Sequence, residues 1–277
     1  MRDLKDFFYQ VYGPDFATLN WIFVHGLMGA GQNWRKIISQ LEKTDRCLTY
    51  DQRGHGRSFK PEAGYSPEDY TADLHFLTES LGWTKFILVG HSMGGRTAFH
   101  FASTYPEKVS HLIIEDIGPE AHPRAHEYFE KLLGVVPDFF ESRAAAKDFF
   151  EREFPLKAQT KDKIKAVANF LYTNIIELED GRATFRFRRE NIIETVKKGR
   201  SHALWDHIAR LNMPTLWIRG QNSLELSEAH FQKISEINPR IERVTIPHSG
   251  HWVHVDQPQL FHEAICRFIQ HSDCKAF

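Results

Sequence analysis

A serine enclosed by glycines, between an apolar run and a helical pattern, constrains this chain more than any other feature. Phe86 to Val89 has the pattern of a buried strand, Gly90 to Gly94 matches G-x-S-x-G around Ser92, and a helical pattern begins at Met93. In this context the motif places the serine hydroxyl on a strained strand-to-helix turn, and the glycines let neighbouring backbone pack closely. The sequence therefore predicts that Ser92 is a nucleophile, against the alternative of an inert serine in a glycine-rich turn.

Short apolar runs alternate with amphipathic stretches along most of the chain, which is typical of a parallel sheet covered by helices on both faces. We therefore expect an α/β fold. The predicted strands cover Trp21 to Val24, Cys47 to Tyr50, Phe86 to Val89, His111 to Glu115, Thr215 to Ile218 and Arg243 to Ile246. The predicted helices cover Asn33 to Leu41, Pro67 to Leu81, Met93 to Thr104, Leu226 to Ile237 and Pro258 to Ile269.

The alternation stops between about residues 119 and 205, where phenylalanine and charged residues crowd together in a mostly helical pattern. This stretch starts directly after a predicted strand and ends just before the next one. We therefore predict a core of residues 1–118 and 206–277 with a mainly helical insert of residues 119–205. A lid, or cap, over the active edge of the sheet is the natural use of such an insert.

The charge of the chain is nearly balanced, because 35 lysines and arginines oppose 36 acidic residues among 277. This balance provides no overall positive field for nucleic acid. Apolar runs fall short of the roughly 20 residues that span a bilayer, and none of signal-peptide length follows the start. The three cysteines (Cys47, Cys266, Cys274) are widely spaced without a C-x-x-C pair, which argues against a zinc site or a disulfide framework. We expect a cytoplasmic protein without metal; no local signature predicts its oligomeric state.

A serine hydroxyl becomes a good nucleophile only when an imidazole takes its proton and a carboxylate orients that imidazole. The loop after the last predicted strand offers three histidines, His248, His251 and His254. We choose His251, because it follows Gly250 where the chain can reach over the sheet edge. A metal site formed by the three histidines is disfavoured, since no matched carboxylate pattern accompanies them.

Backbone amides that bind an oxyanion are the other element that acyl transfer requires. The residue after the nucleophile, Met93, supplies one donor, and Leu27 supplies the other from the loop after the first predicted strand. His25 in that loop is expected to brace it, or to be a histidine satisfied at a strand end.

The sequence offers two candidates for the carboxylate that orients the imidazole. Serine stands at position 223, in the turn after the strand that follows the insert, where an aspartate is usual. Glu225 lies slightly downstream, and Asp116 lies at the carboxyl end of the strand that follows the nucleophile helix. Both positions are allowed, because catalytic groups gather at the carboxyl ends of parallel strands.

Taken together, these motifs resemble the α/β-hydrolase superfamily over nearly the full length of the chain. His25-Gly26, Asp51 to Ser58, Gly90 to Gly94 and Gly250 to Trp252 occur in the order of that family. Asp116 to Pro119 and the turn that ends at Ser223 are similar to the YbfF-type serine esterases and related abhydrolase-domain proteins. That resemblance implies that Asp116 holds His251 and that Ser223 hydrogen-bonds the same imidazole as a fourth member.

The expected activity is hydrolysis of carboxylic esters, or of acyl thioesters, through an acyl-enzyme and without a cofactor. Two alternatives stay open. Arg96 follows two glycines as in menaquinone-pathway lyases of the same fold, which bind dicarboxylates, and a ligand-binding protein could keep the pocket without turnover. The expected partner is a small acyl ester or thioester.

The insert contains a basic strip, residues 182–200, with a local formal charge of +5. If Thr184 to Arg188 is extended, Phe185 and Phe187 share one face and the arginines the other. The phenylalanines could then line an apolar pocket, and the arginines could meet an anionic group or solvent. The candidate substrate contacts are His25, Met28, Arg96, Phe185, Phe187 and Trp252.

Overall fold

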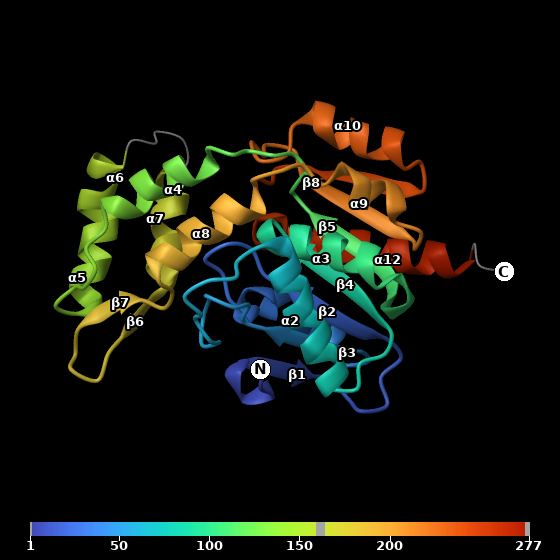
Figure 1. Cartoon of the computed structure of the whole chain (residues 1–277), viewed down its shortest axis with the longest axis horizontal. Helices are drawn as coiled ribbons and strands as arrows, with labels where there is room; N and C mark the ends of the chain where they lie inside the picture. Colours follow the sequence, from blue (N-terminus) through green and yellow to red (C-terminus); the bar gives the residue numbers. More distant parts are fainter. Residues whose placement is uncertain (1, 159–163, 275–277) are drawn as a thin grey trace.

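The computed structural model, which describes residues 2–158 and 164–274, is built on a central sheet of seven strands (Figure 1). The strand order is β1-β3-β2-β4-β5-β8-β9, and only the β1–β3 pair is antiparallel. The strands are β1 (Tyr9–Tyr12), β2 (Asn20–Val24), β3 (Arg46–Tyr50), β4 (Phe86–His91), β5 (Val109–Glu115), β8 (Thr215–Gly220) and β9 (Ile241–Ile246). The mostly parallel sheet predicted from the sequence is confirmed.

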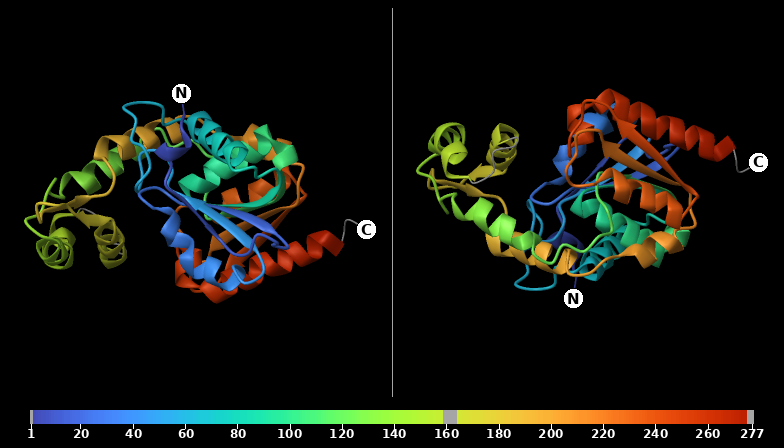
Figure 2. Two further views of the ribbon diagram at one scale, coloured as in Figure 1. Left: turned by 90° about the horizontal axis from the view of Figure 1, so that it is seen from below. Right: turned by 90° about the horizontal axis from the view of Figure 1, so that it is seen from above.

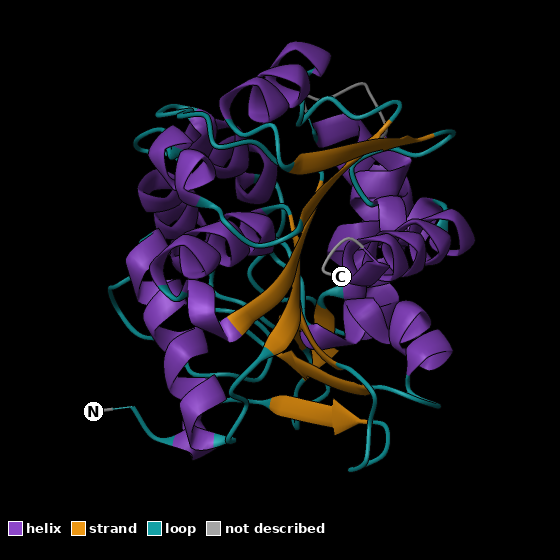
Figure 3. Cartoon of the chain, turned by 90° about the vertical axis from the view of Figure 1, so that its right-hand side faces the viewer, coloured by secondary structure: helices purple, strands orange, loops and turns teal. Residues whose placement is uncertain are grey.

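Helices cover both faces of this sheet (Figure 3). One layer contains α2 (Pro67–Ser80), α3 (Met93–Thr104), α9 (Trp205–Arg210) and α10 (Glu228–Ile237). The other contains α1 (Arg35–Leu41), α11 (Val253–Asp256) and α12 (Pro258–Cys274). Successive side chains of β2 alternate between the two apolar clusters, since Ile22 and Val24 join one and Trp21 and Phe23 join the other. This two-sided burial explains the continuous apolar runs of the central strands.

Residues 119–205, predicted as the insert, add no strand to the central sheet in their described part. This segment contains α4 (Ala125–Gly134), α5 (Arg143–Asp148), a π-helical turn (Phe149–Glu153), α6 (Phe154–Lys157), α7 (Ile164–Thr173), a hairpin of β6 (Ile175–Glu177) and β7 (Ala183–Phe185), and α8 (Arg189–Gly199). Much of it projects to one side of the sheet (Figure 2). Its apolar side chains form a separate cluster, which Met28 of the loop after β2 also joins. Its two ends run side by side, because Leu204 N donates to Pro119 O at 2.7 Å.

Two parts of the architecture differ from the expectation. Strand β1 was not predicted, because this antiparallel edge strand is only partly buried and lacks an apolar run. The β6–β7 hairpin adds two short strands to an insert expected to be mainly helical. No helix within the described residues is long and apolar enough to cross a membrane. Cys47 and Cys266 are free thiols, whereas the side chain of Cys274 lies outside the described part.

Candidate active site

Ser92 occupies a strained turn between β4 and α3. Its backbone has a φ of 53° and a ψ of −121°, a conformation that costs a non-glycine residue about 1–3 kcal/mol and persists only where the surroundings enforce it. Ser92 N donates to Glu115 O at 3.0 Å, which fixes the turn to β5. A Cβ at Gly94 would lie 2.4 Å from the carbonyl oxygens of Val24 and His25, so this position requires glycine.

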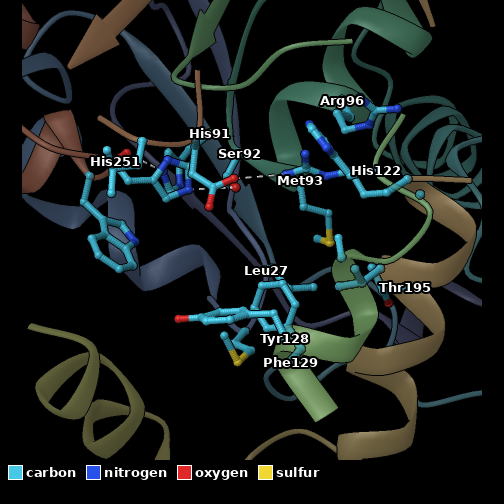
Figure 4. Close-up of a pocket in the computed structure, with 18 of the residues that line it drawn as sticks. Leu27, His91, Ser92, Met93, Arg96, His122, Tyr128, Phe129, Thr195 and His251 are labelled. Carbon is cyan, nitrogen blue, oxygen red and sulfur yellow. Dashed lines mark hydrogen bonds and ion pairs between the residues drawn. The ribbon is translucent and has the colours of Figure 1, made fainter. Parts of the chain in front are cut away.

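His251 connects Ser92 to a buried carboxylate. Its Nε2 lies 2.9 Å from Ser92 Oγ and its Nδ1 lies 2.8 Å from Asp116 Oδ2. His251 belongs to the loop after β9, and Asp116 directly follows β5. Figure 4 shows the imidazole of His251 beside Ser92 at one side of the cavity. An imidazole in this position can take the hydroxyl proton through Nε2 while its Nδ1–H is held by the carboxylate.

Asp116 is fully buried and held by several donors. Its Oδ1 accepts a hydrogen bond from Gly220 N at 2.9 Å, and its Oδ2 accepts one from the hydroxyl of Ser223. The hydrogen bond predicted between Ser223 and the imidazole of His251 is therefore not the one that the structure shows. Both ring nitrogens of His251 already face Ser92 and Asp116, and Ser223 reaches the same network through the carboxylate.

Glu225, the alternative carboxylate, has other contacts. It lies 3.4 Å from the guanidinium of Arg200 and its side chain is half-exposed, while its backbone N donates to Ser223 Oγ at 3.1 Å. The structure therefore brings Asp116, and not Glu225, into hydrogen-bond contact with His251. Burial raises the pKa of Glu225, but the charges of His251 and Arg200 outweigh it and lower this pKa from its ordinary value.

The charges around His251 favour its protonated form. Burial lowers the pKa of His251, but the hydrogen bond to Asp116 and the negative charges of Glu225, Asp116 and Glu115 outweigh it and raise this pKa above its ordinary value. His91 shows the opposite balance, since burial and the charges of His251 and His254 hold its pKa well below its ordinary value. A proton is thus better accommodated on His251 than on the imidazole beside it.

The two amides expected to bind an oxyanion both belong to residues that line the cavity around Ser92. Met93 is the first residue of α3, so its N–H has no acceptor within the helix. Leu27 follows Gly26, where a Cβ would lie only 3.2 Å from the Cβ of Ser92. The loop that carries Leu27 is therefore packed against the serine.

His25 supports the loop that carries Leu27. Its Nε2 accepts a hydrogen bond from Gln52 N at 2.9 Å, and its Nδ1 lies 2.8 Å from Gly26 O. Burial lowers the pKa of His25 to about 4, so the ring is neutral near pH 7. His25 does not line the cavity, and its contacts are those of the loop support that was expected.

A cavity of about 1480 Å³ opens over Ser92, between the sheet edge and the inserted segment. Its mainly apolar lining includes Met28 and Trp252, two of the expected substrate contacts. The insert contributes side chains that no sequence motif marked, because a helical pattern does not tell which face lines a pocket. They include His122, Tyr128, Phe129, Leu132, Val167, Phe170 and Thr195.

Phe185 and Phe187 lie elsewhere. They are buried in the apolar cluster of the insert, where their rings stack at 4.5 Å, and they do not line the cavity. Several cations of the basic strip have local partners. Arg189, for example, donates hydrogen bonds to the backbone oxygens of Val136 and Pro137. Arg200, at the end of the strip, does line the cavity.

Arg96 lines the cavity from α3, and its guanidinium also donates hydrogen bonds to three backbone oxygens. Its Nη1 donates to Gly118 O at 2.7 Å and to Glu120 O at 3.2 Å, at one end of the insert. Its Nη2 donates to His202 O at 3.4 Å, at the other end. Arg96 thus joins the nucleophile helix to both connections of the inserted segment.

The three histidines after β9 have different partners. His251 contacts Ser92 and Asp116, His254 contacts Glu115, and His248 lies exposed on the surface with a φ of 54°. No cluster of three or more potential metal ligands was found in the residues that the structure describes.

Comparison with known proteins agrees with this architecture. Residues 22–258 match the family model of the alpha/beta hydrolase fold. The sn-1-specific diacylglycerol lipase ABHD11 of Mus musculus is 31% identical over 94% of this chain and 84% of its own. The 2-(acetamidomethylene)succinate hydrolase of Mesorhizobium japonicum is 27% identical over 90% and 87%. A solved marine microorganism esterase superposes with a TM-score of 0.80 at 28% identity, covering 95% of this chain and 98% of its own. The chain therefore belongs to the α/β-hydrolase fold family.

Proposed function

We propose that this protein is a serine hydrolase that cleaves carboxylic esters through an acyl-enzyme intermediate. The observation that carries the proposal is the continuous contact from Ser92 through His251 to the buried Asp116, at 2.9 and 2.8 Å, at the wall of a large cavity. A strained serine aligned with an imidazole and a carboxylate has the geometry that nucleophilic acyl transfer requires.

In this mechanism Ser92 Oγ attacks the acyl carbon while His251 Nε2 takes the hydroxyl proton. Asp116 stabilises the imidazolium, and the amides of Leu27 and Met93 stabilise the negative oxygen of the tetrahedral intermediate. The intermediate collapses to an acyl-serine, and His251 gives its proton to the departing alcohol. Water, deprotonated by His251, then attacks the acyl-serine. The second tetrahedral intermediate releases the acid while His251 returns the proton to Ser92 Oγ, which restores the hydroxyl.

The cavity supports the proposed substrate class. We propose that residues 119–205 form a cap over the site and that α4 and α7 supply the apolar wall for the substrate. The volume of about 1480 Å³ exceeds the roughly 300–1,000 Å³ of ordinary small-molecule pockets and suits an ester with a sizeable apolar chain. The lipase and esterase relatives support this class. The same steps would cleave an acyl thioester, with a thiol as the leaving group.

The lyase alternative receives less support from the surroundings of Arg96. Three backbone carbonyls at the two ends of residues 119–205 accept from Nη1 and Nη2. These bonds explain the position of Arg96 without a substrate, although Nε is buried and has no partner among the described residues. A pocket without turnover would not require the strained backbone of Ser92.

A panel of acyl esters of increasing chain length, assayed beside matched thioesters with the unchanged protein and Ser92→Ala, tests the proposal. We expect ester hydrolysis that Ser92→Ala abolishes. Undiminished hydrolysis by Ser92→Ala, or inactivity of the folded protein towards the whole panel, would contradict it.

A further inference from the structure

A second acid–imidazole pair lies beside Asp116 and His251. Glu115, the last residue of β5, is fully buried, and His254 is 3% exposed. The Glu115 carboxylate accepts a hydrogen bond from His254 N at 2.9 Å and lies 2.8 to 2.9 Å from His254 Nδ1 through both oxygens. Neither side chain lines the cavity, and neither takes part in the proposed reaction steps.

The pair ties together the segments that carry the reacting groups. The backbone oxygen of Glu115 accepts the hydrogen bond from Ser92 N, and the next residue is Asp116. His254 lies three residues after His251, in the short helix α11 that closes the loop. The contact between Glu115 and His254 therefore fastens the loop of His251 to the strand end that already holds Ser92 and Asp116.

The rest of the loop depends on a few polar contacts of the same kind. His91 Nε2 lies 2.9 Å from the backbone oxygen of His251, and Gly250 N donates to Asp256 at 2.7 Å. The ring of His254 also stacks on Trp34, with 4.3 Å between the ring centroids. A hydrogen bond and a stacking contact thus both act on His254, and an experiment must separate them.

A buried pair of this kind is weak evidence for a contribution to global stability. Replacing a buried polar pair by apolar residues of similar volume is often neutral or stabilising, because taking charges out of water costs free energy. In addition, His254 Nε2 is buried and lacks a hydrogen-bond partner among the described residues. With its proton on Nδ1, the imidazole of His254 donates a hydrogen bond to the Glu115 carboxylate. The arrangement is better explained by control of geometry than by net stabilisation.

We propose that Glu115 and His254 are positioning residues whose hydrogen bonds hold the loop of His251 against β5, so that the imidazole stays aligned between Ser92 and Asp116. This inference rests on the proposed function, because alignment matters only if His251 activates Ser92. Since the pair lies outside the cavity, its loss should reduce kcat and leave KM nearly unchanged.

Two substitutions of His254 separate the hydrogen bond from the stacking. His254→Asn keeps an N–H donor near the position of Nδ1 without the ring, whereas His254→Phe keeps a ring on Trp34 without the donor. We expect His254→Phe to lower kcat at least about tenfold with KM within about twofold, because small misalignments of reacting groups are costly. His254→Asn should stay within about threefold of the unchanged protein, since the donor to Glu115 is kept. A kcat of His254→Phe equal to or above that of His254→Asn would overturn the proposal.

Asp45→Asn is the matched control. It alters a buried carboxylate that accepts a hydrogen bond from Trp21 Nε1 at 3.0 Å, at the amino ends of β2 and β3 and away from the site. We expect it to change the midpoint of urea unfolding and to leave kcat unchanged. A loss of kcat in Asp45→Asn as large as in His254→Phe would show a general effect of stability and overturn the positioning role.

Glu115→Gln provides a second measurement if His254→Phe fails to fold. It keeps an acceptor for His254 but removes a negative charge near His251, which also faces Asp116, Glu225 and His91. Because a neutral acceptor holds His254 less tightly than a carboxylate, kcat should fall while KM stays within about twofold. A kcat equal to that of the unchanged protein would contradict the proposal. Activity retained in Ser92→Ala would instead refute the proposed function. An inactive Ser92→Ala, together with equal activities of the unchanged protein and both His254 variants, would refute only the positioning role.

Discussion

Oδ2 of Asp116 lies 2.8 Å from Nδ1 of His251, although the two residues are 135 positions apart in the chain. The contact forms because β5 ends beside β8, which in turn pairs with β9, so the loops after β5 and β9 meet at one sheet edge. In the proposed mechanism the orienting carboxylate thus follows β5, while the position after β8 holds Ser223, which donates to the same carboxylate.

Replacing the two candidate carboxylates one at a time tests this assignment. Asp116→Asn should lower kcat by about 10³ to 10⁴-fold, because an amide stabilises neither the correct tautomer nor the imidazolium, as holds for serine proteases with the same change. Glu225→Gln should stay within about tenfold, since Glu225 pairs with Arg200. Steady-state hydrolysis of one activated ester by both variants decides between them, and the reverse order would refute the assignment.

Removing the Ser223 hydroxyl should weaken the hold on Asp116. Ser223→Ala deletes a buried hydrogen bond to a charged group, worth about 1.5–3 kcal/mol, so we expect kcat to fall about tenfold. Ser142→Ala is the matched control, because Ser142 caps α5 outside the cavity and its loss should lower only the free energy of unfolding, by about 1 kcal/mol. Equal kcat values in the two variants would mean that Ser223 is an ordinary turn residue.

The activity should fall on the acid side as His251 becomes protonated. The pKa of His251 is raised, so the unchanged protein should lose activity as the pH decreases through a value above 6.5. Glu225→Gln removes a negative charge that raises this pKa, and its acid limb should therefore move to lower pH. The pH profiles of kcat/KM measure both limbs. A shift of the variant to higher pH would contradict the electrostatic account.

Glycine at position 94 should be required for full stability of the fold. In Gly94→Ala the new Cβ would meet the carbonyl oxygens of Val24 and His25 at 2.4 Å, and such overpacking costs about 1–3 kcal/mol or more. Gly134→Ala, in α4, meets nothing within 4 Å and should be neutral or slightly stabilising. Urea unfolding of the two variants gives the comparison, and similar midpoints would contradict the packing argument.

Local patterns predicted most of the core. The central strands are buried on both faces, so their apolar runs were visible, and the context of Ser92 marked the turn before α3. The exposed edge strand β1 has no such run.

Contacts between distant segments were harder to predict. The contact of Ser223 with Asp116, and that of His254 with Glu115, depend on which loops meet in space, and spacing along the chain does not encode this. Phe185 and Phe187 alternate as predicted, but alternation does not tell whether a face lines the cavity or the interior of the insert. Here both rings pack inside the insert.

Mass spectrometry of the protein quenched during ester turnover tests the central claim most directly, since it detects the covalent intermediate itself. We expect the protein mass to increase by one acyl group, the modified peptide to contain Ser92, and neither the adduct nor hydrolysis to occur in Ser92→Ala. Ester hydrolysis that continues in Ser92→Ala, or an acyl group carried on a residue other than Ser92, would contradict the account.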